Sequence, residues 1–389
     1  MRCLEVSDLQ DDRQGLDDVD ETDEQQDERH IAREGHACDR AAEEQRAGVA
    51  HEHLRRVEVI DQKAEQAARQ RACEDGHAGV ADARADRREE YRDRHRDARG
   101  KAVDAVGEIT HNNHLFFPKI ESHKTTINNI INEGKSLARF GDGEFSIIYG
   151  TNRWSFQQYD EQLSERLLQV LQSDNDKLMI AIADNYGDLS KYTSESKSEI
   201  RAYMTDETRK KHETLLNKNK TYHDAYITRW YMMMNDKKTE APANRLSNLK
   251  KIWNNKNVIA VEGEFTRLGV GNNLFDNAAS FKRIIAPGTN SFRKYDDILN
   301  ACLKYGSKND LFLLAIGPSS GVLAYDLVQN DYQAIDVGHI DLEYMWYLAG
   351  AENRTSIPSR YNNEVDPDVI PEPVQDNSYY EQIIWKYTD

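Results

Sequence analysis

The stretch from Ser136 to Tyr149 reads SLARFGDGEFSIIY, and the rest of the chain repeats its pattern of an apolar strand followed by polar residues. The apolar run ends in Arg139, Phe140 and Gly141. Asp142 and Glu144 are then expected in a tight turn, because the flanking glycines let the backbone turn sharply and approach a ligand closely. Two carboxylates at the end of a strand suit a hard cation or a sugar hydroxyl. The alternative is an ordinary surface turn, since Asp and Gly are common turn residues.

The composition of the 389-residue chain changes near residue 107. Residues 1–106 contain no Pro, Asn, Phe or Trp, and Lys63 and Lys101 are their only lysines. This charged, low-complexity segment has too few large apolar residues to offset the entropy of ordering, so we expect it to be disordered. Its residues come mostly from codons that begin with G or C, which also suggests an over-extended or wrong-frame gene start. A globular domain with a C-terminal tail is expected over residues 111–389.

Charge, hydropathy and cysteine content narrow the class of protein. A net charge of −17 argues against a nucleic-acid binder, which normally carries a basic patch. No stretch is apolar for long enough to span a bilayer, and the first residues lack the apolar core of a signal peptide. The four cysteines form no CxxC pair, which fits a reducing cytoplasm.

Apolar strand-like runs alternate with helical patterns from residue 111 onward, and this alternation predicts a mostly parallel sheet with helices on both faces. We expect strands at 136–141, 177–183, 257–261, 283–286, 311–316 and 334–337. We expect helices at 117–132, 162–172, 245–253, 272–281, 295–305, 321–329 and 341–349, a polar helical region before residue 216, and a surface tail at the end.

Ligands of parallel α/β sheets bind outside the carboxyl ends of the strands. Several polar residues and a glycine are expected at those ends in this chain: Arg139, Asp142, Asp184, Arg229, Glu262, Gly317 and Asp336. The sequence therefore predicts a polar pocket at that edge of the sheet.

The loop Gly317–Gly321, GPSSG, joins a predicted strand to a predicted helix. Free N–H groups and the partial positive charge of a helix start suit a phosphate, and the hydroxyls of Ser319 and Ser320 can add donors. The alternative is a capped helix without a ligand.

A second polar loop, Glu262–Asn273, reads EGEFTRLGVGNN. Arg267 is suited to paired hydrogen bonds with a diphosphate, and Gly269 allows close backbone approach. Asn272 is suited either to contact a base or ribose or to cap the next helix. The alternative for the whole loop is an elaborate turn without a ligand.

The stretch Asp336–Glu343, DVGHIDLE, holds four ionisable groups at the end of the last expected strand. We expect Asp336 and His339 to belong to a site, with His339 acting as a base, a metal ligand or a hydrogen-bond donor. Asp341 and Glu343 fit either a site or the first turn of a helix.

Five blocks together resemble one family: RFGDGEF, VEGEFTRLGVGNNLFDNA, RIIAPGTNSFRKYDDIL, LLAIGPSSGVLAYDL and QAIDVGHIDLEYMW. They are similar, in this order, to the GT-D type glycosyltransferases, formerly a bacterial domain of unknown function, over residues 116–365. The resemblance implies a Rossmann-like fold and transfer of a hexose from a nucleotide-diphosphate sugar, such as UDP-glucose. The chain departs from the family at GPSS, where GPTA is frequent, and at Met345–Trp346, where the family often has an acid–aromatic pair.

The resemblance also implies roles for individual residues. Asp142 and Glu144 correspond to the Asp-x-Glu motif and would hold a divalent metal, Mn²⁺ or Mg²⁺. We expect catalytic roles for Asp142, Glu144, Asp336 and His339. We expect donor contacts from Arg139, Glu262, Arg267, Gly269, Asn272, Gly317, Ser319 and Ser320.

The implied acceptor is a glycan or glycoprotein, assembled in the cytoplasm at the inner face of the membrane, with peripheral association to a glycan-assembly complex. No nucleic-acid partner is expected. One rival interpretation is another Rossmann-like nucleotide-sugar enzyme, which needs a GxGxxG turn that RFGDGE does not supply. Another is a carbohydrate-binding or assembly module without catalysis.

Overall fold

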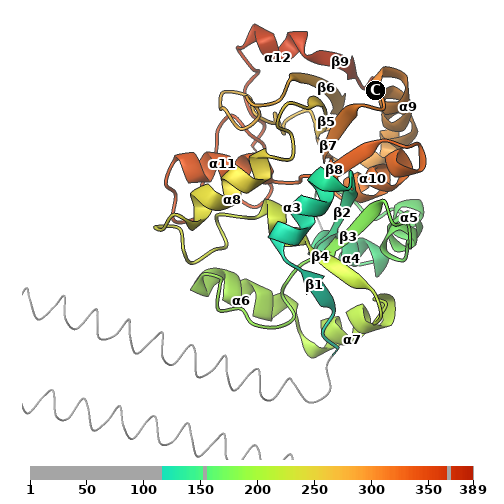
Figure 1. Cartoon of the computed structure of the whole chain (residues 1–389), viewed down its shortest axis with the longest axis vertical. Coiled ribbons are helices and arrows are strands. Elements are labelled where there is room, and N and C mark those ends of the chain that lie inside the picture. Colours follow the sequence, from blue (N-terminus) through green and yellow to red (C-terminus); the bar gives the residue numbers. More distant parts are fainter. Residues whose placement is uncertain (1–115, 152–155, 366–368, 389) are drawn as a thin grey trace, which may run out of the picture. The chain divides into compact units, whose positions relative to one another are not determined.

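The computed structural model describes residues 116–151, 156–365 and 369–388 (Figure 1). The predictions for residues 1–106 lie outside this part of the chain. Within the described ranges, no helix is both long and apolar enough to cross a membrane.

The described residues form a nine-stranded sheet in which every pair of neighbouring strands is parallel (Figure 1). The predicted α/β class is therefore confirmed. Its spatial order is β1-β4-β3-β2-β8-β7-β5-β6-β9. The strands are β1 (Lys119–Glu121), β2 (Ser136–Phe140), β3 (Leu178–Ile182), β4 (Thr221–Asp224), β5 (Asn257–Gly263), β6 (Ser280–Ala286), β7 (Asp310–Ala315), β8 (Gln333–Asp336) and β9 (Ile383–Lys386).

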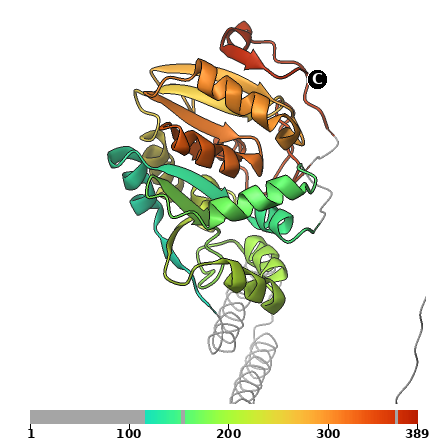
Figure 2. The same ribbon diagram turned by 90° about the vertical axis from the view of Figure 1, so that its right-hand side faces the viewer.

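Alternate residues of the strands enter two separate apolar cores, because successive side chains of a strand point to opposite faces. On β2, Leu137 belongs to one core and Ala138 to the other. One core contains residues of α4 (Asp142–Ile148), α5 (Glu161–Leu171), α9 (Tyr295–Tyr305) and α10 (Ser319–Gln329). The opposite core contains residues of α3 (His123–Asn132), α8 (Ala241–Lys250) and α11 (Ile340–Leu348). Figure 2 shows α5, in green, across the first of these faces.

Three further α-helices complete the described part. They are α6 (Ser194–Tyr203), α7 (Asp206–Leu215) and α12 (Asn377–Glu381), and two short 3₁₀ helices lie at Ala225–Thr228 and Ser291–Lys294. The polar helical region predicted before residue 216 is confirmed as α6 and α7.

The structure corrects several expected elements. Residues 119–121 form β1 instead of the first turn of a helix, and the expected tight turn at Asp142 is the start of α4. The expected helix at 272–281 is replaced by turns and bends up to residue 279 and by the start of β6. Their backbone is held by tertiary hydrogen bonds, including one from Trp253 Nε1 to the carbonyl of Leu274 at 3.1 Å. The C-terminal tail adds α12 and β9, and β9 pairs with β6 at the edge of the sheet.

Candidate active site

A cavity of about 380 Å³ lies at the carboxyl ends of the central strands. It is lined by residues that follow β2, β3, β4, β5, β7 and β8. Strand β2 pairs with β3 on one side and with β8 on the other. The chain therefore leaves β2 in one direction and returns on its other side, which is the switch point where α/β sheets place ligands.

Arg139 and Asp336 form the floor of this cavity. Arg139 Nη2 donates to Asp336 Oδ1 at 2.9 Å, and Arg139 Nε donates to the carbonyl of Asp336 at 3.0 Å. Arg139 Nη1 also reaches the carbonyl of Ala225 at 3.3 Å. Burial raises the pKa of Asp336, and the guanidinium opposes that shift. Arg139 thus ties together the ends of β2, β8 and β4, and its predicted place at the site agrees with the cavity lining.

The two carboxylates of the GDGE motif lie at the first turn of α4, and both line the cavity. Glu144 Oε2 accepts a hydrogen bond from the backbone N–H of Gly141 at 2.7 Å, which satisfies one of the free donors at the helix start. Burial raises the pKa of Glu144 to about 7, and the nearby charge of Asp336 contributes to the shift. Asp142 is exposed to solvent.

His339 also lines the cavity, in contact with Arg229, which was expected at a strand end, and with Asn363, which was not. Its Nδ1 accepts from Arg229 Nη2 at 3.1 Å, and its Nε2 lies 3.3 Å from Asn363 Oδ1. The guanidinium has only donors, so Nδ1 is the acceptor and Nε2 carries the proton. Burial and then the charge of Arg229 lower the pKa of His339 to about 4. Glu364 lines the cavity as well and forms a two-point ion pair with Arg229.

The loop after β7 brings backbone, not hydroxyl groups, to the cavity. Gly317 has φ of +64° and lines the cavity with Pro318, just before the start of α10. A Cβ at Gly317 would lie 2.6 Å from the ring of Phe156, so only glycine fits. Ser320 Oγ accepts from the N–H of Ile316 at 3.0 Å, and Ser319 Oγ accepts from Ser291 at 3.0 Å.

The loop after β5 is shaped by its own polar residues, and the structure differs here from the expected donor contacts. Glu262 is fully buried, forms an ion pair with Arg283, and accepts from the N–H of Leu268 at 2.6 Å. The N–H of Gly269 and the side chain of Asn272 both donate to Asp341 Oδ1 at 2.8 Å.

Thr266 is the residue of this loop that lines the cavity, while Arg267 lines a separate cavity. Within the described residues, Glu262, Arg267, Gly269 and Asn272 do not line this cavity, and their expected donor contacts stay predictions.

The carboxylates of the cavity fit a divalent cation only if water and substrate supply its remaining ligands. Among the described residues, no group of three or more His, Cys, Asp or Glu side chains is placed to hold a metal by itself. Asp142 and Glu144 nevertheless both line the cavity with their carboxylates in the first turn of α4. Mg²⁺ is commonly held by one or two carboxylates together with water and substrate phosphates, so this donor set fits a cation that arrives with its substrate.

Sequence reasoning missed several residues of the cavity, among them Tyr226, Asn363 and Glu364. Tyr226 follows β4, which is only four residues long and gives no clear apolar run. Asn363 and Glu364 lie in an irregular segment after α11. Their charge and polarity are visible in the sequence, but their place at the cavity depends on long-range contacts with His339 and Arg229.

A parallel sheet with a carboxylate-lined cavity at its switch point defines a Rossmann-like α/β protein with a ligand site at the strand ends. The model of the family described as "Glycosyltransferase GT-D fold" matches residues 137–365. The chain therefore belongs to the glycosyltransferase family with the GT-D fold, as the sequence motifs indicated.

Two curated relatives are streptococcal proteins. The chain is 35% identical over 256 residues to "Probable glycosyl transferase Gly" of Streptococcus gordonii, covering 66% of this chain and 37% of that protein. It is 34% identical over 264 residues to "Glycosyltransferase GlyD" of Streptococcus pneumoniae, covering 67% and 31%. The chain thus spans about a third of the length of these relatives.

Solved structures agree on the fold. "A New Glycosyltransferase (DUF1792) from Streptococcus sanguinis" is 32% identical with a TM-score of 0.66, covering 70% of this chain and 100% of that one. "The highly conserved domain of unknown function 1792 has a distinct glycosyltransferase fold" describes a second, 32% identical with a TM-score of 0.65, covering 69% and 95%.

Proposed function

We propose that the cavity at the switch point transfers a hexose from a nucleotide-diphosphate sugar, UDP-glucose or a close analogue, to a glycan or glycoprotein acceptor. The observation that carries this proposal is that the starts of two helices, α4 and α10, line the same cavity. The Asp142/Glu144 pair opens α4 on one side, and the Gly317–Pro318 backbone opens α10 on the other. The first suits a sugar or its cation, and the second suits a diphosphate.

Glycosyl transfer builds negative charge on the departing diphosphate and requires a group that takes the proton of the acceptor hydroxyl. The start of α10 and its glycine turn stabilise the negative charge through backbone N–H groups and the helix dipole. Glu144 is suited to take this proton only while its carboxylate binds no cation, because a free base with a pKa of about 7 is poised near neutral pH. His339 is less suited, because Arg229 and Asn363 already occupy both of its ring nitrogens.

A divalent cation, Mn²⁺ or Mg²⁺, would be held by Asp142 and Glu144 and would neutralise charge on the diphosphate. Arg139 keeps Asp336 in place beside them through two hydrogen bonds. This arrangement also supports a role for Asp336 in placing the donor.

The test is a donor screen that measures release of free UDP from several UDP-sugars, with Mn²⁺, with Mg²⁺ and with a chelator. We expect release with one hexose donor and loss of release in the chelator. Sugar binding without UDP release under any donor would instead support a binding module.

The acceptor side belongs to the same proposal, and membership of a glycosyltransferase family supports it. We expect a glycan or glycoprotein acceptor and cytoplasmic action at the inner face of the membrane, in peripheral association with a glycan-assembly complex. Co-purification with membranes from the native host is the measurement that checks this placement.

A further inference from the structure

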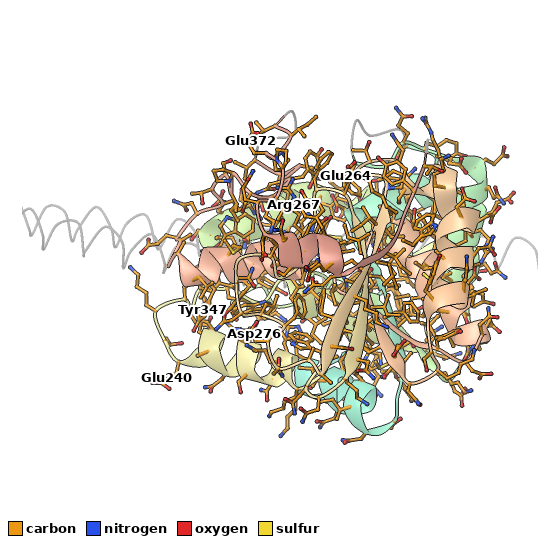
Figure 3. All side chains as sticks on the ribbon, turned by 90° about the horizontal axis from the view of Figure 1, so that it is seen from above. Glu240, Glu264, Arg267, Asp276, Tyr347 and Glu372 are labelled. Carbon is orange, nitrogen blue, oxygen red and sulfur yellow. The ribbon has the colours of Figure 1, made fainter. Side chains whose placement is uncertain are left out.

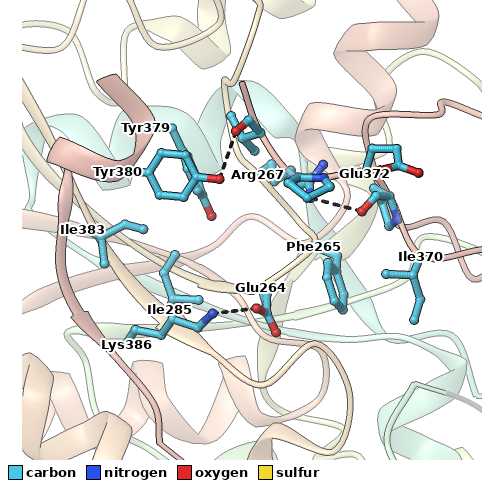
Figure 4. Close-up of a pocket in the computed structure, with 13 residues that line it drawn as sticks. Glu264, Phe265, Arg267, Ile285, Ile370, Glu372, Tyr379, Tyr380, Ile383 and Lys386 are labelled. Carbon is cyan, nitrogen blue, oxygen red and sulfur yellow. Dashed lines mark hydrogen bonds and ion pairs between the residues drawn. The ribbon is translucent and has the colours of Figure 1, made fainter. Parts of the chain in front are cut away.

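A second cavity, of about 500 Å³, lies at the carboxyl ends of β5, β6 and β9. It is lined by the loop that follows β5, by Ile285 of β6, by the ends of β9 and by the segment 370–380 (Figure 4). Figure 3 shows Glu264, Arg267 and Glu372 close together, apart from Asp276 and Tyr347. This cavity uses the same edge of the sheet as the first, but different strands.

The walls of this second cavity are largely apolar and aromatic. Tyr379 is buried, whereas Tyr380 is 50% exposed and donates its hydroxyl to the carbonyl of Val374 at 2.9 Å (Figure 4). Phe265 and Pro371 line it as well. Flat aromatic and proline surfaces beside a few polar groups are typical of sites that hold a ring-shaped ligand.

Arg267 is the buried charge of this cavity, with only 5% of its surface exposed. Its Nη1 and Nη2 donate to the carbonyls of Ser359 at 3.1 Å and Pro371 at 3.4 Å, and its Nε has no partner. Among the described residues, no carboxylate forms an ion pair with it. A buried guanidinium without an ion-pair partner is costly, so the site favours an anion from outside.

The neighbouring carboxylates supply only part of that counter-charge, because Glu262 is paired with Arg283 and Glu264 with Lys386. Glu264 is bound to Lys386 at 2.6 Å and to the hydroxyl of Tyr387 at 3.0 Å. Glu372 is exposed at the rim and makes no ion pair with Arg267. Arg267 is held by backbone in a left-handed conformation, with φ of +56°, which fixes its direction.

The two cavities share one wall. Thr266 lines the first cavity, and its neighbours Phe265 and Arg267 line the second. The carbonyl of Phe265 accepts from the N–H of Tyr361, another residue of the first cavity, at 3.1 Å. A long ligand that extends out of the first cavity would therefore pass only the backbone around Thr266 before it reached the second cavity.

We infer that the second cavity binds an anionic sugar unit of the acceptor, with its carboxylate or phosphate on Arg267 and its ring against Tyr380 and Phe265. The assignment of this sugar unit to the acceptor rests on the proposed function. The binding of an anionic sugar does not rest on that function, because it requires only the cavity, its aromatic wall and the guanidinium of Arg267, which has no ion-pair partner among the described residues.

In the test, glucuronic acid, glucose 6-phosphate, glucose and inorganic phosphate are each titrated into the full-length protein in the absence of donor. NMR chemical shifts of the protein report the binding. We expect glucuronic acid or glucose 6-phosphate to bind at least roughly tenfold more tightly than glucose, because a charge-assisted hydrogen bond is lost with the neutral sugar. The stronger of the two identifies the anion. Inorganic phosphate binding as tightly as glucose 6-phosphate would overturn the sugar assignment.

Arg267→Gln is expected to reduce the affinity for the anionic sugar to that for glucose, and Arg267→Lys to retain part of the difference. Tyr380→Ala, at a half-exposed position that folding tolerates, is expected to weaken both sugars by a similar factor. Arg201→Gln on α6 is the matched control, because it removes an exposed arginine that lines neither cavity. Equal binding by wild type and the folded Arg267→Gln protein would overturn the inference.

Donor turnover by the wild type, measured on the same preparation, separates this inference from the proposed function. Anionic-sugar binding without UDP release would contradict the proposed function alone. UDP release without anionic-sugar binding would contradict the inference alone.

Discussion

Glu144 combines a structural and a chemical task in one side chain. One carboxylate oxygen caps α4 through Gly141, and the residue also lines the cavity beside Asp336. The same burial that makes the cap effective raises its pKa to about 7. Removing the whole side chain would therefore disturb the helix and the chemistry together, and a milder change is needed to separate them.

Glu144→Gln is expected to leave thermal melting nearly unchanged, because an amide oxygen still accepts from the N–H of Gly141. It removes the ionisable carboxylate, and we expect UDP release to fall about hundredfold or more. Glu133→Gln, which changes an exposed carboxylate at the end of α3, is the control and should leave both quantities unchanged. Wild-type turnover by Glu144→Gln would rule out Glu144 as base or metal ligand.

The sequence predicted the position of some site residues better than others. Arg139, Asp142, Glu144, Gly317, Asp336 and His339 all line the first cavity as expected, and their chemical roles stay predictions. They could be placed because parallel strands bring their carboxyl ends to one edge. Glu262 and Asn272 have the same polar character, but Arg283 and Asp341 are their partners. Polarity in a sequence does not reveal whether a partner inside the fold already satisfies it.

At the scale of an element, the turn after β8 depends on a glycine. Gly338 has φ of +45°, and a Cβ there would lie 1.9 Å from Arg139 Nη2. The turn therefore brings its backbone against the guanidinium that holds the strand ends together.

Gly338→Ala is expected to displace Arg139, to lower UDP release and to destabilise the protein by about 2–3 kcal/mol, as strain and overpacking add. Gly134→Ala is the matched control, since Gly134 has φ of +65° with open space around it, and should cost only about 1 kcal/mol of strain. Chemical denaturation and UDP release measure both effects. Equal loss in the two variants would mean that contact with Arg139 is unimportant.

The long apolar strands were predictable and the short ones were not. The fully buried runs that became β3 and β7 read clearly, because strands covered on both faces are apolar throughout. Strand β1 has three residues and β4 reads TYHD, so neither shows a period. The sequence predicts only a surface tail for the residues of β9, because the pairing of β9 with β6 is a contact about 100 residues away in sequence.

At the scale of the whole molecule, a buried histidine joins distant elements. His212 of α7 is 1% exposed, and its ring stacks on Phe145 of α4 with centroids 3.9 Å apart. Its Nδ1 lies 2.6 Å from the hydroxyl of Tyr186. Burial lowers its pKa to about 4, so the folded protein holds the ring neutral.

This lowered pKa predicts a loss of stability with acid. His212 binds a proton near pH 6.5 in the unfolded chain but only near pH 4 in the folded one. Its contribution to the free energy of unfolding is therefore complete above pH 6.5 and is lost as the pH falls toward 4. Between pH 7.5 and 5.5 the contribution is about 1 kcal/mol. We expect the advantage of wild type over His212→Phe in urea unfolding to shrink by that amount. An advantage independent of pH would show that His212 titrates alike in both states.

The strip Glu264–Arg267, which separates the two cavities, has a thermodynamic consequence. A ligand on Arg267 and a ligand beside Thr266 would contact neighbouring residues of this four-residue segment. If filling one cavity tightens binding in the other by some factor, the reverse effect must have the same size, because the free energy of the doubly bound state does not depend on the order of binding. Donor affinity measured with and without an anionic sugar would therefore report acceptor selectivity before any bond is formed.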